Sequence, residues 1–479
     1  MAAAAEADAT VARAVGGTAR SSWIGRAGGR RRPPVRSPLG RLAREAAAIV
    51  AVVALAIFLV YHFTVRTIRN PRPLGGVNVD VSRAPGIQSE AAIAVDPRHP
   101  QELLAASNDS LIPTLRVLTS RDGGRTWRRA AGPAVPHDSC AHGEPRVAVD
   151  ADGRQYLAFL AGRICGDRLT PYLVVASRPD ASARWTLRTV THPAWQYGFD
   201  DGPALAIDPR TGAVYVAFTR SLSIDHETMM WSVSRDHGAT WSAPATVSRS
   251  LVHPHLASLA VARNGDVYLA GIDTAHGIWV ARSTDGGRSF GAPVRAAPLV
   301  QNPAYGCALS AYSPLPQEDR VCIGPDPTVV ARPGQVDVVF GDGGANGAGD
   351  VFVAALTPAL RPLFRTQVNP KDRGKTSQFL PVAAGDPSTG ALWACWYDTT
   401  FDPHAHRAWF TCSVSHDGRT WTAPDKAAGV PTAPGDLFAV ASQNGLYPAL
   451  AADAGVAHPL WPDGRRVPLS IDVFTASVR

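Results

Sequence analysis

Seven side chains stand just before short apolar segments that are distributed along residues 77–479. Four of them are acids, and the full set is Glu90, Glu144, Asp201, His255, Asp326, Gln378 and Tyr447. Acids brought together can hold a hard cation such as Ca²⁺, for which Glu90, Glu144, Asp201 and Asp326 would be the ligands. Two carboxyl groups, or a tyrosine with a nearby carboxylate, can instead cleave a glycosidic bond. The third alternative is structural, with each acid capping its strand in a hydrated channel.

The apolar segments themselves form a repeat. They recur seven times at intervals of about 50–70 residues, as in AAIAVDPRHP from Ala91 and PALAIDPRTG from Pro203. Most are followed by a second apolar segment and then by a third. Short strands with regular turn signals are typical of all-β repeat folds. We therefore predict a β-propeller over residues 77–479, with seven four-stranded blades and six as the alternative. The seven side chains would then surround one mouth of its channel.

A second motif lies between the third and fourth predicted strands. SRDGGRTW, from Ser120 to Trp127, returns as SRDHGATW, STDGGRSF and SHDGRTW. Asp accepts backbone N–H bonds in turns, Gly permits positive φ, and the aromatic residue can pack into the sheet. A catalytic residue would not be copied four times, so we interpret these acids as structural turn residues: Asp122, Asp236, Asp285 and Asp417.

The pattern S-x-D-x-G-x-T-W resembles the Asp box, or BNR repeat, of the sialidase-like (neuraminidase) superfamily. The C-terminal run YPALAADAGVAHPLWPDGR resembles the last blade of the exported bacterial members, and residues 77–82 could close the ring against it. In catalytic sialidases a tyrosine nucleophile works with a glutamate and an aspartic acid donates the proton. The resemblance implies these roles for Tyr447, Glu144 and Asp201.

Other expected features of catalytic sialidases are missing or unassigned. The stretch SEAAIAVD lacks the Arg-Ile-Pro motif, and the substrate-binding arginines are only candidates: Arg146, Arg163 and Arg320. Trp195 and Tyr197 could stack on a sugar or simply pack a long loop. Two functions stay open. The favoured one is a non-catalytic propeller that binds glycan or protein at the cell surface, and the alternative is an exo-sialidase or related glycoside hydrolase.

The loops also differ between the two ends of the predicted strands. Turns joining first to second strands are uniformly short, whereas the long insertions 190–202, 300–325, 342–350, 398–407 and 428–446 all fall at the opposite, upper face. Function usually resides where a scaffold is elaborated. We expect the site at the upper face.

Residues 46–65 form an apolar run without formal charge, long enough to cross a bilayer as a helix. Nine arginines and three acids precede it, which places residues 1–45 in the cytoplasm as a disordered tail. We predict a single-pass plasma-membrane anchor, a linker over 66–76 and an extracytoplasmic propeller, with a cleaved export signal as the alternative. The tail carries most of the net charge of +7, so the basic pI does not indicate nucleic-acid binding.

All six cysteines follow the apolar run, as expected for disulfides outside the cell. Six cysteines allow about 15 connectivities, and no CxxC spacing indicates zinc. Their positions in the predicted blades favour the pairs Cys140–Cys165, Cys307–Cys322 and Cys395–Cys412.

Overall fold

The computed structural model describes residues 78–479 apart from short gaps. The gaps are 113, 135–138, 140, 163–170, 192–197, 224–225, 274–276, 301–312, 316–317, 344–348, 372–375, 403, 434–445 and 467–469. The predicted tail, anchor and linker lie outside the described residues. Within 78–479, less these gaps, no helix has the length and apolarity needed to span a membrane.

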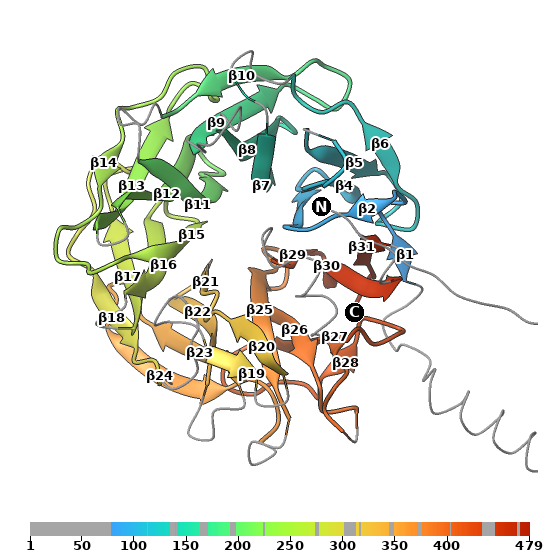
Figure 1. Cartoon of the computed structure of the whole chain (residues 1–479). Helices are drawn as coiled ribbons and strands as arrows, with labels where there is room; N and C mark the ends of the chain where they lie inside the picture. Colours follow the sequence, from blue (N-terminus) through green and yellow to red (C-terminus); the bar gives the residue numbers. More distant parts are fainter. Residues whose placement is uncertain are drawn as a thin grey trace, which may run out of the picture. The chain divides into compact units, whose positions relative to one another are not determined.

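Strands dominate the described chain and form seven antiparallel sheets of four, arranged in a ring (Figure 1). Blade 1 comprises β3 (Ala92–Asp96), β4 (His99–Ser107), β5 (Arg116–Ser120) and β6 (Arg128–Ala130). Blade 2 comprises β7 (Ala141–Val149), β8 (Gln155–Gly162), β9 (Pro171–Arg178) and β10 (Thr186–Thr189). Blade 3 comprises β11 (Phe199–Ile207), β12 (Val214–Ser223), β13 (His226–Ser234) and β14 (Ala245–Thr246). Blade 4 comprises β15 (His255–Val261), β16 (Val267–Asp273), β17 (Gly277–Ser283) and β18 (Val294–Ala297). Blade 5 comprises β21 (Thr328–Arg332), β22 (Gln335–Asp342), β23 (Asp350–Leu356) and β24 (Pro362–Gln367). Blade 6 comprises β25 (Gln378–Gly385), β26 (Leu392–Asp398), β27 (Trp409–Ser415) and β28 (Asp425–Lys426). The predicted seven-bladed propeller is confirmed.

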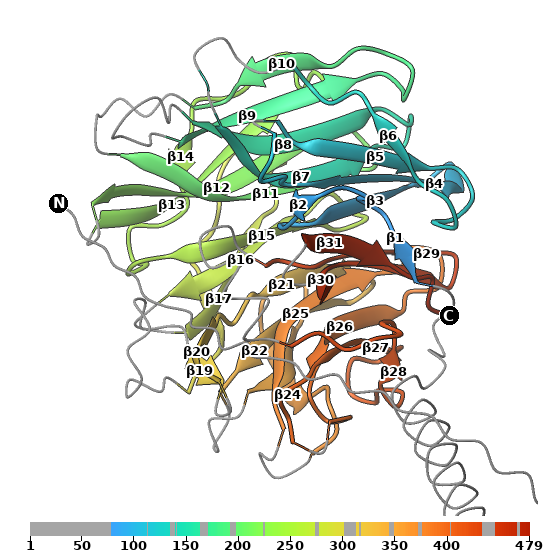
Figure 2. The same ribbon diagram turned by 45° about the vertical axis from the view of Figure 1, so that its right-hand side comes forward.

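The seventh blade joins the two ends of the described chain. It contains β29 (Ala449–Asp453), β30 (Val456–Arg466) and β31 (Ser470–Thr475), and its outermost strand is the N-terminal β1 (Val79–Asp80). β1 pairs antiparallel with β31, and β2 (Gly86–Ile87) adds a parallel pairing to the same strand (Figure 2). The ring is therefore closed by hydrogen bonds between segments that are distant in sequence, as the residues near 77–82 predicted.

Burial explains why the second strand of each blade reads as a continuous apolar run. Every residue of β8, β16 and β26 is buried, because these strands lie inside blades that are covered on both sides by their neighbours. The inner strands are only half-buried, since one side borders the channel, as in β15. The core thus lies between blades, where Trp279, Trp396 and Trp461 are almost completely enclosed.

The four Ser-x-Asp motifs fold as hairpin turns between third and fourth strands. In the first, one Asp122 carboxylate oxygen accepts the Thr126 N–H at 2.8 Å and the other accepts the Thr126 hydroxyl at 2.6 Å. Ser120 accepts the Gly124 N–H at 2.9 Å, and the Trp127 indole donates to the Gly124 carbonyl at 3.1 Å. Asp236, Asp285 and Asp417 make equivalent bonds to the threonine or serine near the end of their motif. These carboxylates are therefore engaged in hydrogen bonds within the turns that they stabilise.

One of the three predicted disulfides is described and is confirmed. Cys395 of β26 and Cys412 of β27 lie directly opposite each other and are bonded, with Cα atoms 4.0 Å apart. Cys140, Cys165 and Cys307 lie outside the described residues. Cys322 belongs to β20 (Glu318–Ile323), which pairs with β19 (Ser313–Leu315) in an insertion between blades 4 and 5, and its side chain is not described.

Candidate functional site

The upper end of each inner strand carries a local break in the strand geometry. In six blades one residue here has positive φ: Glu90, Glu144, Gly202, Leu256, Asp326 and Leu380, with φ between 40° and 57°. In four blades the pairing with the second strand also slips at this point, as between Gly143 and Arg146. Such bulges redirect side chains and recur next to functional sites.

This break corrects the alignment of the seven predicted side chains. Glu90, Glu144 and Asp326 occupy the positive-φ position itself, whereas Asp201 and His255 precede it by one residue. A left-handed backbone costs a residue with a side chain roughly 1–2 kcal/mol. Three acids therefore adopt an unfavourable conformation at equivalent positions, a feature that tends to cluster at functional sites.

A cavity of about 280 Å³ lies among these residues. All seven inner strands contribute to its lining, so it occupies the channel itself. Its polar lining side chains are Glu144, Arg146, Asp201, His255, Ser258, Asp326, Thr328 and Tyr447. The structure thus brings together most of the residues predicted for the upper channel mouth.

Glu90 lies just behind the cavity and is 5% exposed. Its carboxylate accepts the Glu144 N–H at 2.7 Å and a hydrogen bond from the Asn108 side chain. Burial raises the pKa of Glu90 to about 7, against the opposing effect of these bonds and of Arg146. The sequence analysis missed Asn108, which follows β4 and bridges Glu90 to the Glu144 backbone at 3.1 Å.

Glu144 is held between blades 2 and 3. One carboxyl oxygen accepts the Gly202 N–H at 2.9 Å, and the side chain is hydrogen-bonded to that of Asp201. Burial raises the pKa of Glu144 well above its ordinary value, and the charges of Asp201 and Glu90 add to the rise. The carboxyl group of Glu144 is therefore harder to ionise than an exposed one.

Asp201 also faces blade 4. Its Oδ2 lies 3.4 Å from Nε2 of His255, and the other ring nitrogen of His255 lies 3.9 Å from Glu227. Glu227, near the start of β13, is a second residue that the sequence analysis missed. The groups from Glu144 through Asp201 and His255 to Glu227 thus place one imidazole between carboxyl groups, and the first three of them line the cavity.

Arg146 is the cation that these acids share. It lowers the pKa of Glu90, Glu144 and Asp326 against the effect of burial. Its guanidinium carbon lies 5.9 Å from the centre of the Tyr447 ring. Tyr447, the one tyrosine among the described residues that line this cavity, therefore lies beside a positive charge.

Asp326 differs from the other acids because its Oδ2 is buried and has no hydrogen-bond partner among the described residues. Burial raises its pKa to about 7. It lies between Pro325 and Pro327, neither of which has an N–H to offer. A carboxyl group that lines a cavity in this state is poised to hold a proton near neutral pH.

Gln378, the sixth of the seven predicted side chains, is not part of the cavity. It is 1% exposed and bonds Asn369, Asp398 and Thr400 within a separate polar network of blades 5 and 6. It precedes the positive-φ Leu380 by two residues, and its side chain lies in this buried network rather than in the channel. Arg163, Trp195 and Tyr197 lie outside the described residues, as does the side chain of Arg320.

A metal site is not formed by the described residues. No group of three or more His, Cys, Asp or Glu side chains in this part of the chain is placed to hold a metal ion. Three of the four predicted ligands, Glu90, Glu144 and Asp326, instead lie close enough to Arg146 for its charge to lower their pKa values. The guanidinium of Arg146 would repel a cation. The predicted calcium site thus finds no support in the geometry.

Comparison with known proteins finds similar folds and no similar sequences. No family model and no curated protein matches the chain. The Hadza microbial sialidase Hz136 is 16% identical with a TM-score of 0.45, covering 79% of this chain and 76% of its own. The GH93 α-L-arabinofuranosidase of Fusarium graminearum is 11% identical with a TM-score of 0.46, covering 85% and 98%. The NanB sialidase of Streptococcus pneumoniae is 8% identical with a TM-score of 0.46, covering 79% and 83%.

Two of these three are sialidases by name. What the channel of this chain can bind follows from its own residues.

Proposed function

We propose that the upper channel cavity binds the terminal sugar of a glycan. The observation that carries this proposal is the polar lining of the cavity, in which one arginine lies among buried acids. Burial raises the pKa of Asp326 to about 7 and raises the pKa of Glu144 well above its ordinary value. Protonated carboxyl groups donate hydrogen bonds, while carboxylates accept them. A lining of this kind matches sugar hydroxyl groups, which do both.

The same lining favours a neutral sugar over a strongly anionic one. Arg146 is the only arginine or lysine among the described residues that line this cavity, and the neighbouring acids Glu90, Glu144 and Asp326 are close enough for its charge to lower their pKa values. A ligand carboxylate would have one cation to pair with and several acids to avoid. At about 280 Å³ the cavity is near the lower end of the roughly 300–1,000 Å³ usual for small-ligand sites, which suits a single sugar ring.

Binding can be tested by titrating the full chain with neutral and acidic monosaccharides in a calorimeter. Arg146→Met should weaken binding of the preferred sugar at least tenfold, because it removes the shared donor and leaves the acids unbalanced. Arg125→Met is the matched control, since Arg125 is exposed in the first Ser-x-Asp turn on the opposite face. Equal affinity of wild type and Arg146→Met would contradict the proposal.

Hydrolysis of a glycosidic bond is a second candidate, favoured by the unpartnered carboxyl group of Asp326. A general acid needs a proton at the pH where it acts, and burial supplies that condition here. Tyr447 beside Arg146 would be the nucleophile, because the positive charge favours its phenolate. Glu144 would be its base, and burial raises the pKa of Glu144 well above its ordinary value, which favours uptake of the tyrosine proton.

This candidate is tested with fluorogenic glycosides, including an arabinofuranoside and a sialoside. Asp326→Asn and Tyr447→Phe should each abolish turnover without weakening sugar binding more than a few-fold. The wild-type rate should fall as the pH rises above about 7, when Asp326 loses its proton. If no glycoside is turned over while sugar binding persists, the propeller is a binding module.

We also propose that residues 46–65 anchor the propeller at the outer side of the plasma membrane. The support is the apolar run with its arginine-rich N-terminal flank. The Cys395–Cys412 disulfide adds to it, because such bonds persist mainly in oxidising compartments. A glycan-binding site on a tethered propeller would act on sugars of the cell's own envelope or of its surroundings.

A further inference from the structure

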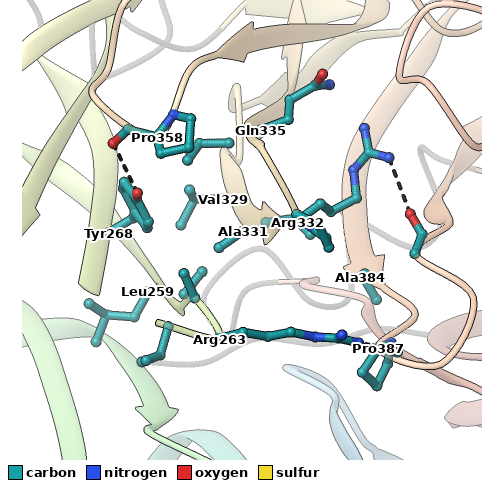
Figure 3. A pocket seen from close by; sticks show the side chains of 18 of the residues that line it. Leu259, Arg263, Tyr268, Val329, Ala331, Arg332, Gln335, Pro358, Ala384 and Pro387 are labelled. Carbon is teal, nitrogen blue, oxygen red and sulfur yellow. Dashed lines mark hydrogen bonds between the residues drawn. The ribbon is translucent and has the colours of Figure 1, made fainter. Parts of the chain in front are cut away.

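A second, larger cavity opens on the lower face, where first strands turn into second strands. It measures about 830 Å³ and lies among the inner strands of blades 4, 5 and 6 (Figure 3). Its walls are mainly apolar and include Leu259, Val329, Ala331 and Ala384. It meets the upper cavity at Ser258, Leu259, Thr328 and Ala383, but it contains none of the acids of the upper cavity. The two sites are therefore distinct in chemistry.

The repeat changes at the blades that form this cavity. In five blades the turn after the inner strand begins with an aspartate whose carboxylate accepts a backbone N–H of its own turn. These are Asp96, Asp150, Asp208, Asp386 and Asp453. Blades 4 and 5 have Ala262 and Arg332 at this position. Both residues line the cavity, so two acids are absent where the cavity opens and a cation replaces one of them.

The charges at the mouth of the cavity single out Arg263. Among the described residues Arg210, Arg263 and Arg332 line the cavity together with one acid, Asp386. Arg210 pairs with Asp208 at 3.5 Å and Arg332 pairs with Asp337, which leaves Arg263 as the lining arginine that no carboxylate of the described residues neutralises. Asp386 already accepts the N–H groups of Ser388, at 2.8 Å, and of Gly455, at 2.7 Å. These bonds lower its pKa against the effect of burial, so its charge is fixed in the turn.

Two of the three arginines are held in different ways. Arg332 is enclosed, pairs with Asp337 at 2.7 Å and donates to the Gly390 and His416 carbonyls. Arg263 is exposed and reaches across the mouth from blade 4 to the Pro387 carbonyl of blade 6 (Figure 3). That contact joins a guanidinium to a carbonyl rather than to a carboxylate. An incoming anion would offer Arg263 a stronger, charge-assisted bond.

We propose that this lower cavity binds an amphipathic organic acid. The apolar body would lie against Leu259, Val329 and Ala331, and the acid group would pair with Arg263 at the mouth. The apolar walls disfavour a sugar, and the arginines disfavour a cation. The size falls within the roughly 300–1,000 Å³ typical of small-ligand sites with few polar groups. The proposal is independent of what the upper cavity binds.

The probe is decanoate, titrated into the full chain by calorimetry, with decan-1-ol as the neutral probe of the same length. Ala384→Phe fills the wall of the cavity and should abolish decanoate binding. Ala94→Phe is its matched control, because Ala94 is half-buried at the same place in the inner strand of blade 1, away from the cavity. Arg263→Gln should weaken decanoate binding about tenfold while leaving the weak binding of decan-1-ol unchanged. Arg98→Gln, another turn arginine of the lower face, should leave both unchanged.

The two variants test separate contacts: Ala384→Phe tests the apolar wall of the cavity, and Arg263→Gln tests the pairing with the acid group. Arg263 is exposed, so its substitution does not depend on how the core tolerates the larger side chain of Ala384→Phe. The melting temperature of each variant reports that it is folded. Decan-1-ol binding as tightly as decanoate, decanoate binding unaffected by Arg263→Gln or by a folded Ala384→Phe, or the absence of decanoate binding to the wild type would each overturn the proposal.

Discussion

Replacing Asp326 by Asn should make the protein more stable at alkaline pH, although it removes a residue at the centre of the candidate site. Asp326 is buried, its Oδ2 lacks a partner among the described residues, and its φ is 40°. Asn keeps the shape of the side chain, carries no charge and tolerates a left-handed backbone at least as well. The substitution therefore tests the ionisation of one carboxyl group with little change in packing.

The size of the effect follows from the pKa of Asp326, which burial raises from 3.8 to about 7. Between these values the unfolded chain releases the proton and the folded protein keeps it, so stability falls as the pH rises. A difference of about three pKa units corresponds to at most ~4 kcal/mol above pH 7. Local relaxation and water entry reduce such penalties, and we expect Asp326→Asn to gain roughly 2 kcal/mol at pH 8. Below pH 4 the carboxyl group is protonated in both states and the gain should vanish.

The measurement is urea unfolding of the full chain at pH 4 and pH 8, followed by tryptophan fluorescence. Asp236→Asn is the control with the opposite sign, because hydrogen bonds in its turn lower the pKa of Asp236 to about 2. Asp236→Asn should lose stability at pH 8 and keep most of that loss at pH 4, because the contribution of the carboxylate disappears only as the pH falls toward its folded pKa of about 2. A gain for Asp326→Asn that is equal at both pH values, or a loss at pH 8, would refute the account of a buried, proton-holding carboxyl group.

The remaining predictions concern the scaffold and its location. Asp122→Ala should cost on the order of 1–3 kcal/mol and lower the melting temperature without changing ligand affinity; unchanged stability with lost binding would contradict the structural role of the turn. Replacing both Cys395 and Cys412 by Ser should cost roughly 2–4 kcal/mol in chemical unfolding, because the unfolded chain loses a cross-link; no loss would mean that the bond constrains little. Protease added to intact cells should remove the propeller and spare a tag at residue 1; a released protein starting after residue 65 would favour the cleaved signal.

Local chemistry explains why the fold could be predicted from the sequence. Each Ser-x-Asp turn contains its own hydrogen-bond donors and acceptors, so the four hairpins are visible within eight residues of sequence or fewer. The buried second strands read as apolar runs, which fixes the blade count once the repeat is seen. Cys395 and Cys412 could be paired because they lie on adjacent predicted strands of one blade.

The site could be predicted only in part, since one backbone detail controls its geometry. In six blades a positive-φ residue at the top of the inner strand shifts neighbouring side chains by one position, and a one-residue shift changes which face they occupy. A proline follows this position in four blades, as in Glu144-Pro145 and Asp326-Pro327, and is the signal that could have aligned those blades correctly. Asn108 lies 36 residues before Glu144, and no local pattern indicates that it approaches it.

The acids of this propeller divide into two kinds by their effect on stability. Asp122 and its equivalents accept hydrogen bonds, their pKa values are lowered, and their removal should destabilise the fold. Asp326, Glu90 and Glu144 adopt strained backbone conformations, and burial raises their pKa values. Their ionisation opposes folding, so stability gives no reason for three such acids to surround Arg146. A ligand that uses their protons and lone pairs does give one. That reasoning supports the proposed sugar site at the upper channel, although the upper cavity is the smaller of the two.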